Sequence, residues 1–455
     1  MARAKKEAAL TPEERLQAAL VPDWEWPHKL PENWCWTTVG AINQYVGISA
    51  DPTKAKNKTF ELYSVPSSAD NYPEIVLGAD IGSTKQAVKK GDVLLCKINP
   101  RINRVWKVSK YTDHSLLASS EWIVVRNSRL ISNYLMWCFQ SPYFRGYMLS
   151  NVSGVGGSLM RAQPKFVQGY PVPVPPLAEQ QRVVDRIESL FAKLDEAKEK
   201  AQAVVDSFET RKAAILHKAF TGELTTKWRE EHGVRMESWE KKSVGELCIS
   251  LKYGTAKKSD ASGNVVVLRM GNLQQGEIDW SDLAYSNDPD DIERYKLFPG
   301  DVLFNRTNSA ALVGKTAIYR GEHPAIYAGY LIKLDYDHDK IIGDYLNYAL
   351  NTLDAKKYCN SVKTDGVNQS NINAKKIGAY SFNVPNIPEQ EKIVSVIQKL
   401  LSKEQQSKAA AEAVLDQIDL MKKSILARAF RGELGTNDPN EESAVELLKE
   451  IIRRG

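Results

Sequence analysis

The sequence predicts a mixed α/β protein in which two globular domains are separated by two long antiparallel coiled-coil helices, as a pseudo-two-fold internal repeat. The first observation is a duplication, because residues 175–224 recur as residues 385–434 at one constant offset without a gap. The second is a seven-residue spacing of apolar residues in both copies. The third is the chain between the copies, which is long enough for a globular domain. Internal repetition of this kind indicates the architecture before any local pattern does.

Both copies of the repeat are predicted to be coiled-coil helices, because apolar residues at seven-residue steps are typical of a coiled-coil seam. Each helix is expected to begin just after a proline, Pro176 or Pro388, and to end at Gly222 or Gly432. With a rise of about 1.5 Å per residue, each rod would be roughly 60 Å long. The seam residues are Ile187, Leu194, Ala201, Phe208 and Ile215 in the first copy, and Ile397, Ala411, Ile418 and Ile425 in the second, where Glu404 interrupts the series.

The two rods are expected to pair with each other, since both lie on one polypeptide. A rod that joins two chains is the alternative, and the heptad pattern alone does not exclude it. The duplication also extends upstream of the rods. Residues 167–175 match residues 377–385 with a two-residue period that predicts a strand, and residues 91–95 match residues 300–304. Apolar anchors match while the stretches between them differ, so two copies of one fold are expected to carry different surfaces.

The chain is expected to divide into six segments. The pattern Thr11-Pro12-Glu13-Glu14 predicts a helix start in the first of them. The segments are an N-terminal arm (residues 1–20), a first globular domain (21–175), a first spacer helix (176–223), a second globular domain (224–385), a second spacer helix (386–434) and a C-terminal tail helix (435–455).

Composition restricts the class of protein further. No stretch approaches the ~20 consecutive apolar residues of a membrane span, and the N-terminus lacks the apolar core of a signal peptide, so we expect a cytoplasmic protein without a membrane partner. Five scattered cysteines without a Cys-x-x-Cys pair are expected to be reduced. The six histidines show neither metal-ligand spacing nor a partnered nucleophile, so no metal site and no catalytic constellation is predicted.

One short motif favours nucleotide binding, although weakly. Residues 309–316, Ser-Ala-Ala-Leu-Val-Gly-Lys-Thr, fit the phosphate-binding loop except that Ser309 replaces the first glycine. That glycine permits the sharp turn that directs backbone amides at phosphate, and no glycine-rich substitute lies nearby. We therefore expect an ordinary loop here.

Polar and basic loops interleaved with aromatic residues remain, and they suit the reading of DNA bases. Arginine can bridge guanine, and asparagine or glutamine can bridge adenine, through paired hydrogen bonds in the major groove. The same residue types occur in ordinary solvated loops. The net charge of +5 is mild for a DNA-binding protein, which indicates that partners share the neutralisation of phosphates. The candidate DNA-binding residues are Lys85, Gln86, Lys97, Arg101, Asn103, Arg104, Arg161, Gln163 and Lys165 in the first domain, and Arg269, Asn272, Arg306, Asn308, Lys315, Asn368, Gln369 and Asn371 in the second.

Several motifs open and close the two rods or stand at the start of the first domain. They are Pro176-Leu177-Ala178-Glu179-Gln180-Gln181 and Ile387-Pro388-Glu389-Gln390-Glu391, Ala219-Phe220-Thr221-Gly222-Glu223-Leu224 and Ala429-Phe430-Arg431-Gly432-Glu433-Leu434, and Val21-Pro22-Asp23-Trp24 with Leu30-Pro31 and Asn33-Trp34. In these motifs the chain resembles the specificity subunit of type I restriction-modification enzymes, and the resemblance covers essentially its whole length.

The resemblance implies a non-catalytic subunit with two target recognition domains, each reading one half of an asymmetric bipartite site in the major groove of double-stranded DNA. It further implies two modification subunits that bring S-adenosylmethionine and methylate adenine, and restriction subunits that use ATP and magnesium. No cofactor is expected in this chain. Apolar rod positions outside the seam, together with the N-terminal arm and the C-terminal helix, are then expected to dock the modification subunits. These rod positions are Leu190, Val204, Leu400 and Val414.

Two other classes of protein compete with this interpretation. A coiled-coil adaptor without DNA specificity would show no salt-dependent DNA binding, even with its partners present. A nucleotide-using enzyme would bind ATP at Gly314-Lys315-Thr316.

Overall fold

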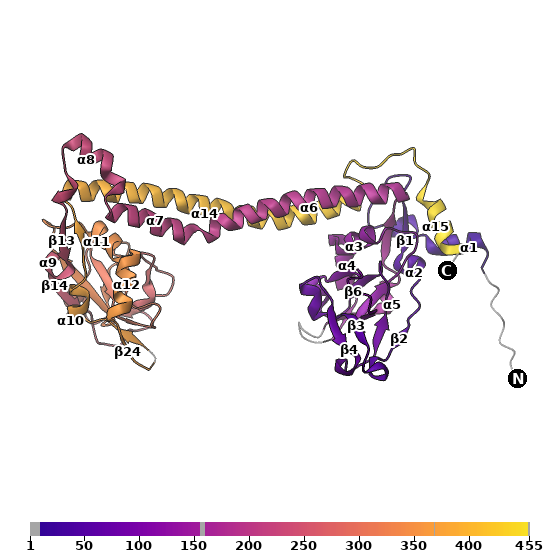
Figure 1. The fold of residues 1–455 in the computed structure, drawn as a ribbon, viewed down its shortest axis with the longest axis horizontal. Helices are drawn as coiled ribbons and strands as arrows, with labels where there is room; N and C mark the ends of the chain where they lie inside the picture. The colour runs from indigo at the N-terminus through magenta and orange to yellow at the C-terminus, as the bar shows by residue number, and fades with distance from the viewer. Residues whose placement is uncertain (1–9, 155–159, 368, 454–455) are drawn as a thin grey trace. The chain divides into compact units, whose positions relative to one another are not determined.

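The structure is a computed structural model that describes residues 10–154, 160–367 and 369–453 (Figure 1). The chain divides into two compact units, residues 1–200 with 414–455 and residues 201–413. Both units combine sheets and helices, as the sequence predicts. In the part of the chain that the structure describes, no helix combines the length and the apolar character needed to cross a bilayer.

The first unit is built around a five-stranded sheet in the order β2-β5-β8-β3-β4 and a three-stranded antiparallel sheet in the order β7-β6-β9. Two further strand pairs, β1 with β12 and β10 with β11, complete it. The strands are β1 (Cys35–Thr38), β2 (Ser49–Ala50), β3 (Thr59–Tyr63), β4 (Glu74–Leu77), β5 (Lys85–Ala87), β6 (Val93–Cys96), β7 (Val105–Lys107), β8 (Ser115–Ala118), β9 (Trp122–Val125), β10 (Val152–Ser153), β11 (Arg161–Ala162) and β12 (Pro171–Val174).

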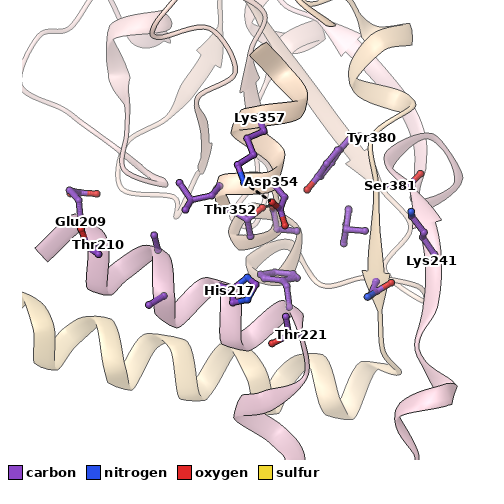
Figure 2. A pocket seen from close by; sticks show the side chains of 17 residues that line it. Glu209, Thr210, His217, Thr221, Lys241, Thr352, Asp354, Lys357, Tyr380 and Ser381 are labelled. Atoms are coloured by element: carbon purple, nitrogen blue, oxygen red, sulfur yellow. Dashed lines mark hydrogen bonds and ion pairs between the residues drawn. The ribbon is translucent and has the colours of Figure 1, made fainter. Parts of the chain in front are cut away.

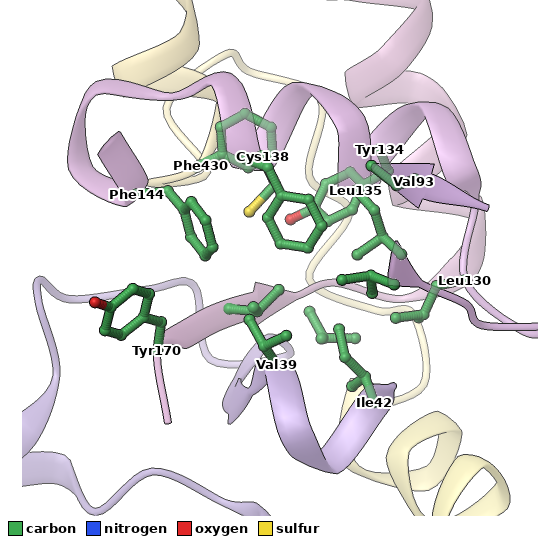
Figure 3. Packing of buried hydrophobic residues seen from close by; sticks show 14 of the residues in the cluster. Val39, Ile42, Val93, Leu130, Tyr134, Leu135, Cys138, Phe144, Tyr170 and Phe430 are labelled. Atoms are coloured by element: carbon green, nitrogen blue, oxygen red, sulfur yellow. The ribbon is translucent and has the colours of Figure 1, made fainter. Parts of the chain in front are cut away.

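Helices cover the first unit and enclose its main core. The capping box expected at Thr11 is present, with Glu14 as its second member. In the core, Tyr134, Leu135 and Cys138 pack with Phe144 and with Phe430 (Figure 3). The helices are α1 (Pro12–Ala19), α2 (Val39–Ile42), α3 (Ser132–Gln140), α4 (Pro142–Ser150), α5 (Pro164–Val167) and α15 (Ala444–Arg453).

The second unit has a four-stranded sheet in the order β14-β23-β19-β21 and three-stranded sheets in the orders β18-β15-β22 and β20-β25-β24. Its helices are α8 (Thr226–His232), α9 (Val244–Leu247), α10 (Pro289–Tyr295), α11 (Gly343–Leu350), α12 (Leu353–Val362) and α13 (Ala374–Gly378). Its strands are β13 (Glu240–Ser243), β14 (Cys248–Tyr253), β15 (Val265–Leu268), β16 (Leu273–Gln274), β17 (Glu277–Ile278), β18 (Tyr285–Ser286), β19 (Val302–Asn305), β20 (Thr307–Asn308), β21 (Thr316–Ile318), β22 (Ala325–Tyr327), β23 (Leu331–Tyr336), β24 (Thr364–Asp365), β25 (Ser370–Asn371) and β26 (Ser381–Val384).

The strand registers show that the two units repeat one topology. Cys35 pairs with Val174 in the first unit, and Glu240 pairs with Val384 at the same place in the second. Strand β6 lies between β7 and β9, and β19 lies between β21 and β23, all antiparallel. Strands β3 and β15 each have one antiparallel and one parallel neighbour. The two-residue period before each rod becomes β12 and β26, respectively.

The predicted antiparallel pairing of the rods is confirmed within each unit. In the first unit, Arg182 of α6 (Leu177–Asp206) donates to the carbonyl of Thr436 at 2.9 Å, while Asp195 pairs with Lys422 of α14 (Ile387–Ala429). In the second unit, Lys408 lies 4.9 Å from the ring centre of Phe208, and Arg211 pairs with Glu404. The glutamate that interrupts the heptad series thus forms an ion pair between the rods.

The expectation of one continuous first rod is wrong, because it divides at Ser207 into α6 and α7 (Phe208–Phe220). The Ser207 hydroxyl donates back to the carbonyl of Ala203, four residues earlier. The Arg211 guanidinium donates a hydrogen bond to the carbonyl of Val204 at 3.0 Å. Side-chain donors that compete for helix carbonyls in this way bend a helix. The second rod is one helix of 43 residues, and it starts at Ile387 with Pro388 in its first turn.

Candidate nucleic-acid interface

In the first unit, three separate segments that carry predicted DNA-binding residues meet at one place. The N–H of Asn99 donates to the carbonyl of Met160 at 2.8 Å, and that of Ala162 donates to the carbonyl of Lys97 at 2.8 Å. The N–H of Lys97 donates to the carbonyl of Glu121 at 3.0 Å. The loop after β6, the strand β11 and the turn before β9 therefore form one cluster, which holds Lys97, Arg101, Asn103, Arg104 and Arg161.

Not every predicted residue of this cluster is free to bind a ligand. Arg101 is exposed, whereas Arg161 is paired with Glu121 at 3.2 Å. The amide of Asn103 donates to the carbonyl of Gln140 at 3.1 Å, from a residue whose φ of 53° is left-handed. Asparagine tolerates that backbone conformation better than most residues, so Asn103 shapes the loop.

The remaining predicted residues of the first unit lie on β5 and at α5. The amide of Gln86 donates to the carbonyls of Ser119 and Trp122 at 3.0 and 2.8 Å, so its donors hold the turn before β9. Lys85 donates to the carbonyl of Ser83. Gln163 precedes α5 and is half-buried, while Lys165 is exposed.

In the second unit, the sheet β20-β25-β24 joins two predicted loops that are distant in sequence. Thr307 pairs with Asn371, and Asn308 pairs with Ser370. Gln369 is exposed beside them, and Asn308 and Asn371 are half-buried. Asn368 lies outside the described residues. The polar residues that surround Arg306 are thus brought to a single ribbon.

Arg306 stands at the base of this ribbon. Its guanidinium carbon lies 4.7 Å from the ring centre of Tyr253, and its Nη1 donates to the carbonyl of Gly329 at 3.3 Å. Its Nε is buried without a hydrogen-bond partner among the described residues. The tyrosine ring beneath the guanidinium orients the plane of the guanidinium. The Arg306 side chain is therefore held in place while its Nε remains without a hydrogen bond from the described residues.

Three predicted residues of the second unit lie apart from the ribbon, near the β16–β17 hairpin. The Nζ of Lys315 donates to Oε1 of Gln274 at 2.8 Å, and Arg269 pairs with Asp282 at 3.0 Å. Asn272 is only 2% exposed; its amide donates to the carbonyls of Asp279 and Asp282, and its Oδ1 accepts from the N–H of Arg269. The assignment of Asn272 to the interface therefore needs correction, because its hydrogen-bonding atoms hold a turn.

The segment that resembles a phosphate-binding loop has a different structure. Residues 309–314 form a turn that ends at Gly314 with φ of 89°, and the chain continues into strand β21. A phosphate-binding loop instead leads into a helix whose N-terminus faces the phosphate. The structure therefore gives no support to the nucleotide alternative.

The rods present apolar residues outside their seam, as the sequence predicts. Val414 is 41% exposed, whereas Leu190, Val204 and Leu400 are half-buried. Two further residues of α14 were missed, Leu420 (64% exposed) and Met421 (47% exposed). The seven-residue step from Val414 to Met421, which places both on one helix face, could have identified Met421.

Known proteins resemble this chain in sequence over both units. Residues 236–413 match a family model described as the type I restriction modification DNA specificity domain. The type I restriction enzyme StySPI specificity subunit of Salmonella potsdam is 27% identical over 340 residues, which cover 72% of this chain and 73% of that protein. The EcoKI specificity subunit of Escherichia coli K12 is 28% identical over 346 residues, with coverage of 72% and 73%. The chain is therefore similar in sequence to type I restriction enzyme specificity subunits.

Solved structures share the fold of this chain. A chain from a study of complex assembly and conformational transition of the type I R-M system has a TM-score of 0.69 at 20% identity, covering 90% of this chain and 100% of that one. The HsdS subunit of Thermoanaerobacter tengcongensis has a TM-score of 0.63 at 22% identity, with the same coverage.

The chain also has a cavity of about 840 Å³ in its second unit, between α7, α12 and β26 (Figure 2). Phe220, Tyr380 and Phe382 line it, and Asp354 pairs with Lys357 at 3.7 Å at its edge. None of the predicted DNA-binding residues lines the cavity.

The duplication explains why this cavity exists. By strand and helix register, Lys241 and Asp354 of the cavity match Trp36 and Tyr143 of the first unit. Those two rings pack around His28, with ring centres 4.9 and 5.7 Å from the imidazole, and the His28 Nε2 lies 2.9 Å from the carbonyl of Phe430. In the first unit, aromatic side chains thus fill this place. In the second unit, charged side chains occupy the matching positions, and the place stays open as a cavity.

Proposed function

We propose that this specificity subunit is non-catalytic and selects an asymmetric, bipartite DNA target, of which each unit reads one half in the major groove. The observation that carries the proposal is the contrast between the repeated scaffold and its loops. The same strand registers recur, while one unit presents the cluster around Lys97 and Arg101 and the other presents the ribbon of Arg306 and Gln369. Different polar loops on one scaffold suit two different short sequences.

The proposal extends to the partners of the subunit. Two modification subunits would dock on the exposed apolar face of the rods, to which Val414 and Met421 belong, and they would bring S-adenosylmethionine for adenine methylation. Restriction subunits would bring ATP and magnesium. An exposed apolar stripe on a helix is a typical site of association with another helix, and this supports the rods as the docking surface.

The replacement Arg306→Ala tests the reading of one half-site. We expect the loss of about 1–3 kcal/mol of discrimination at one base pair if the guanidinium holds a guanine. Adenine methylation by the complete complex should then spread to targets that differ in that half only. The measurement is the sequence of methylated sites in cellular DNA, compared between variant and wild type.

Arg294→Ala is the matched control, because Arg294 also lies over a tyrosine ring, 5.4 Å from the centre of Tyr295, but outside the predicted loops. It should leave the methylated sequence unchanged. An equal loss of affinity for all DNA in the Arg306 variant would instead identify a phosphate contact. Relaxation of both halves at once would contradict the assignment of one half to each unit.

A further inference from the structure

Lys97 and Arg306 directly follow the equivalent strands β6 and β19, and Arg306 is already assigned to base reading. Apart from this pair, two cationic positions recur in both units although the loops around them differ. The backbone carbonyl at the first position accepts a hydrogen bond from the last residue of a strand that lies between two antiparallel neighbours. The N–H of Cys96, which ends β6, donates to the carbonyl of Arg104 at 3.0 Å. The N–H of Asn305, which ends β19, donates to the carbonyl of Lys315 at 2.8 Å. Arg104 and Lys315 therefore occupy equivalent positions in the repeat.

The second cationic position lies one turn into an equivalent helix. Ser141 caps α4 and Thr352 caps α12, and the fourth residue after each cap is Arg145 or Lys356. Both side chains reach back to the loop between the same two strands. Arg145 donates to the carbonyl of Arg101, and the Nζ of Lys356 donates to the carbonyl of Gly314 at 3.0 Å.

None of these four cations is within 4.0 Å of a carboxylate among the described residues. All four are half-buried, and the Nε of Arg145 is buried without a hydrogen-bond partner in the same part of the chain. By contrast, Arg161 and Arg269, at positions that the units do not share, are paired with carboxylates. Among the described residues, Arg145, Lys315 and Lys356 donate only to neutral oxygens. A partly buried cation without a charged partner is electrostatically incomplete, so these positions suit an external anion.

We propose that Arg104 with Arg145, and Lys315 with Lys356, are duplicated contacts to the phosphates of the DNA backbone. The inference rests on the proposed function. The two units face different bases but the same sugar-phosphate backbone, and backbone contacts position a protein without carrying sequence information. Positions at which both units keep a cation, while their other loop residues diverge, fit that shared task.

The surroundings of Lys356 agree with an anion site. Burial lowers the pKa of Lys356 to about 8; the neighbouring Cys359 acts in the opposite direction, and the charges of Lys212 and Lys315 lower the pKa further. A bound phosphate would favour the protonated form and raise this pKa. DNA binding should therefore weaken as the pH rises from 7 to 9 in the wild type. Lys356→Arg should remove the part of this pH dependence that Lys356 contributes, because arginine stays charged.

The test is the salt dependence of DNA binding by the full chain assembled with its modification subunits. Each phosphate contact contributes about 0.9 to the slope of log affinity against log salt concentration. The double variant K315M/K356M should reduce that slope by about 1.8, so the ratio of affinities at 50 and 200 mM salt falls by about tenfold. Target and unrelated DNA should lose affinity equally, and the methylated sequence should stay the same.

Lys357→Met is the matched control, since Lys357 follows Lys356 on α12 but is exposed and pairs with Asp354. It should leave the slope unchanged. If K315M/K356M lowers the unfolding temperature, the variant K315R/K356R provides the test. It keeps both positive charges and should therefore show the wild-type slope of log affinity against log salt concentration. An unchanged slope in K315M/K356M, or a loss confined to the target sequence, overturns the inference. Absence of any salt-dependent binding by the wild type would overturn the proposed function instead.

Discussion

Replacing Arg229 with alanine is expected to lower the free energy of unfolding of the second unit by about 3–5 kcal/mol. The Arg229 guanidinium pairs with Glu389 at 2.7 Å, and the side chains are 9% and 0% exposed. Thr225 and Trp239 also donate to this carboxylate, at 2.7 and 2.9 Å. Removal of the arginine would leave the carboxylate charged and buried at the start of α14, without its cation.

Hydrogen exchange of the first turns of α14, together with denaturant unfolding, measures this effect. Lys227→Ala is the control, because Lys227 lies on the same helix but its ion pair with Glu231 is exposed and 3.9 Å long. Such a pair contributes about 0–1 kcal/mol. The double variant R229M/E389L should recover part of the loss, since it removes both charges. A loss below about 1 kcal/mol for Arg229→Ala would show that this pair does not hold the rod to its unit.

Aspartate at both Val204 and Val414 should abolish co-purification with the modification subunits while both units stay folded. Val414 is 41% exposed and Val204 is half-buried, so a partner that covers the rod would bury the first carboxylate and remove the remaining exposure of the second. Burial of an unpaired charge costs several kcal/mol, roughly the scale of the docking free energy itself. The measurement is recovery of the proposed complex on a tag carried by this chain.

Lys423→Asp provides the control for this experiment. It introduces the same total change of charge at an exposed residue nine positions after Val414, about half a helical circumference away. The complex should still be recovered with this replacement. Alanine at Val204 and Val414 should weaken the complex without abolishing it. Recovery of the full complex with both aspartates would exclude this face of the rods as the docking surface.

The architecture was predictable from the sequence because a duplication constrains both copies at once. The matched residues around Glu179 and Glu389 align the rods, and the heptad spacing gives their seam. The break at Ser207 was not predictable in this way, since Phe208 continues the heptad series through it. The break depends on a serine hydroxyl and an arginine side chain that donate hydrogen bonds to carbonyls of the preceding turn.

The candidate interface was predictable at the level of loops but not of single side chains. Glu121, which neutralises Arg161, is distant in the sequence, so no local pattern could have shown that ion pair. The buried role of Asn272 depends on the carbonyls of a turn that only the fold brings near. Arg145 and Lys356 were missed because they lie on helices, and only the comparison of matched positions between the units identifies them.

The central claim is that two unlike units on one chain each read one half of the DNA target. Mapping the methylated adenines in DNA from cells that carry the intact system tests it most directly. The account predicts one asymmetric motif of two different short sequences, separated by a fixed number of bases that are not read. A single uninterrupted motif, or two identical halves, would contradict it.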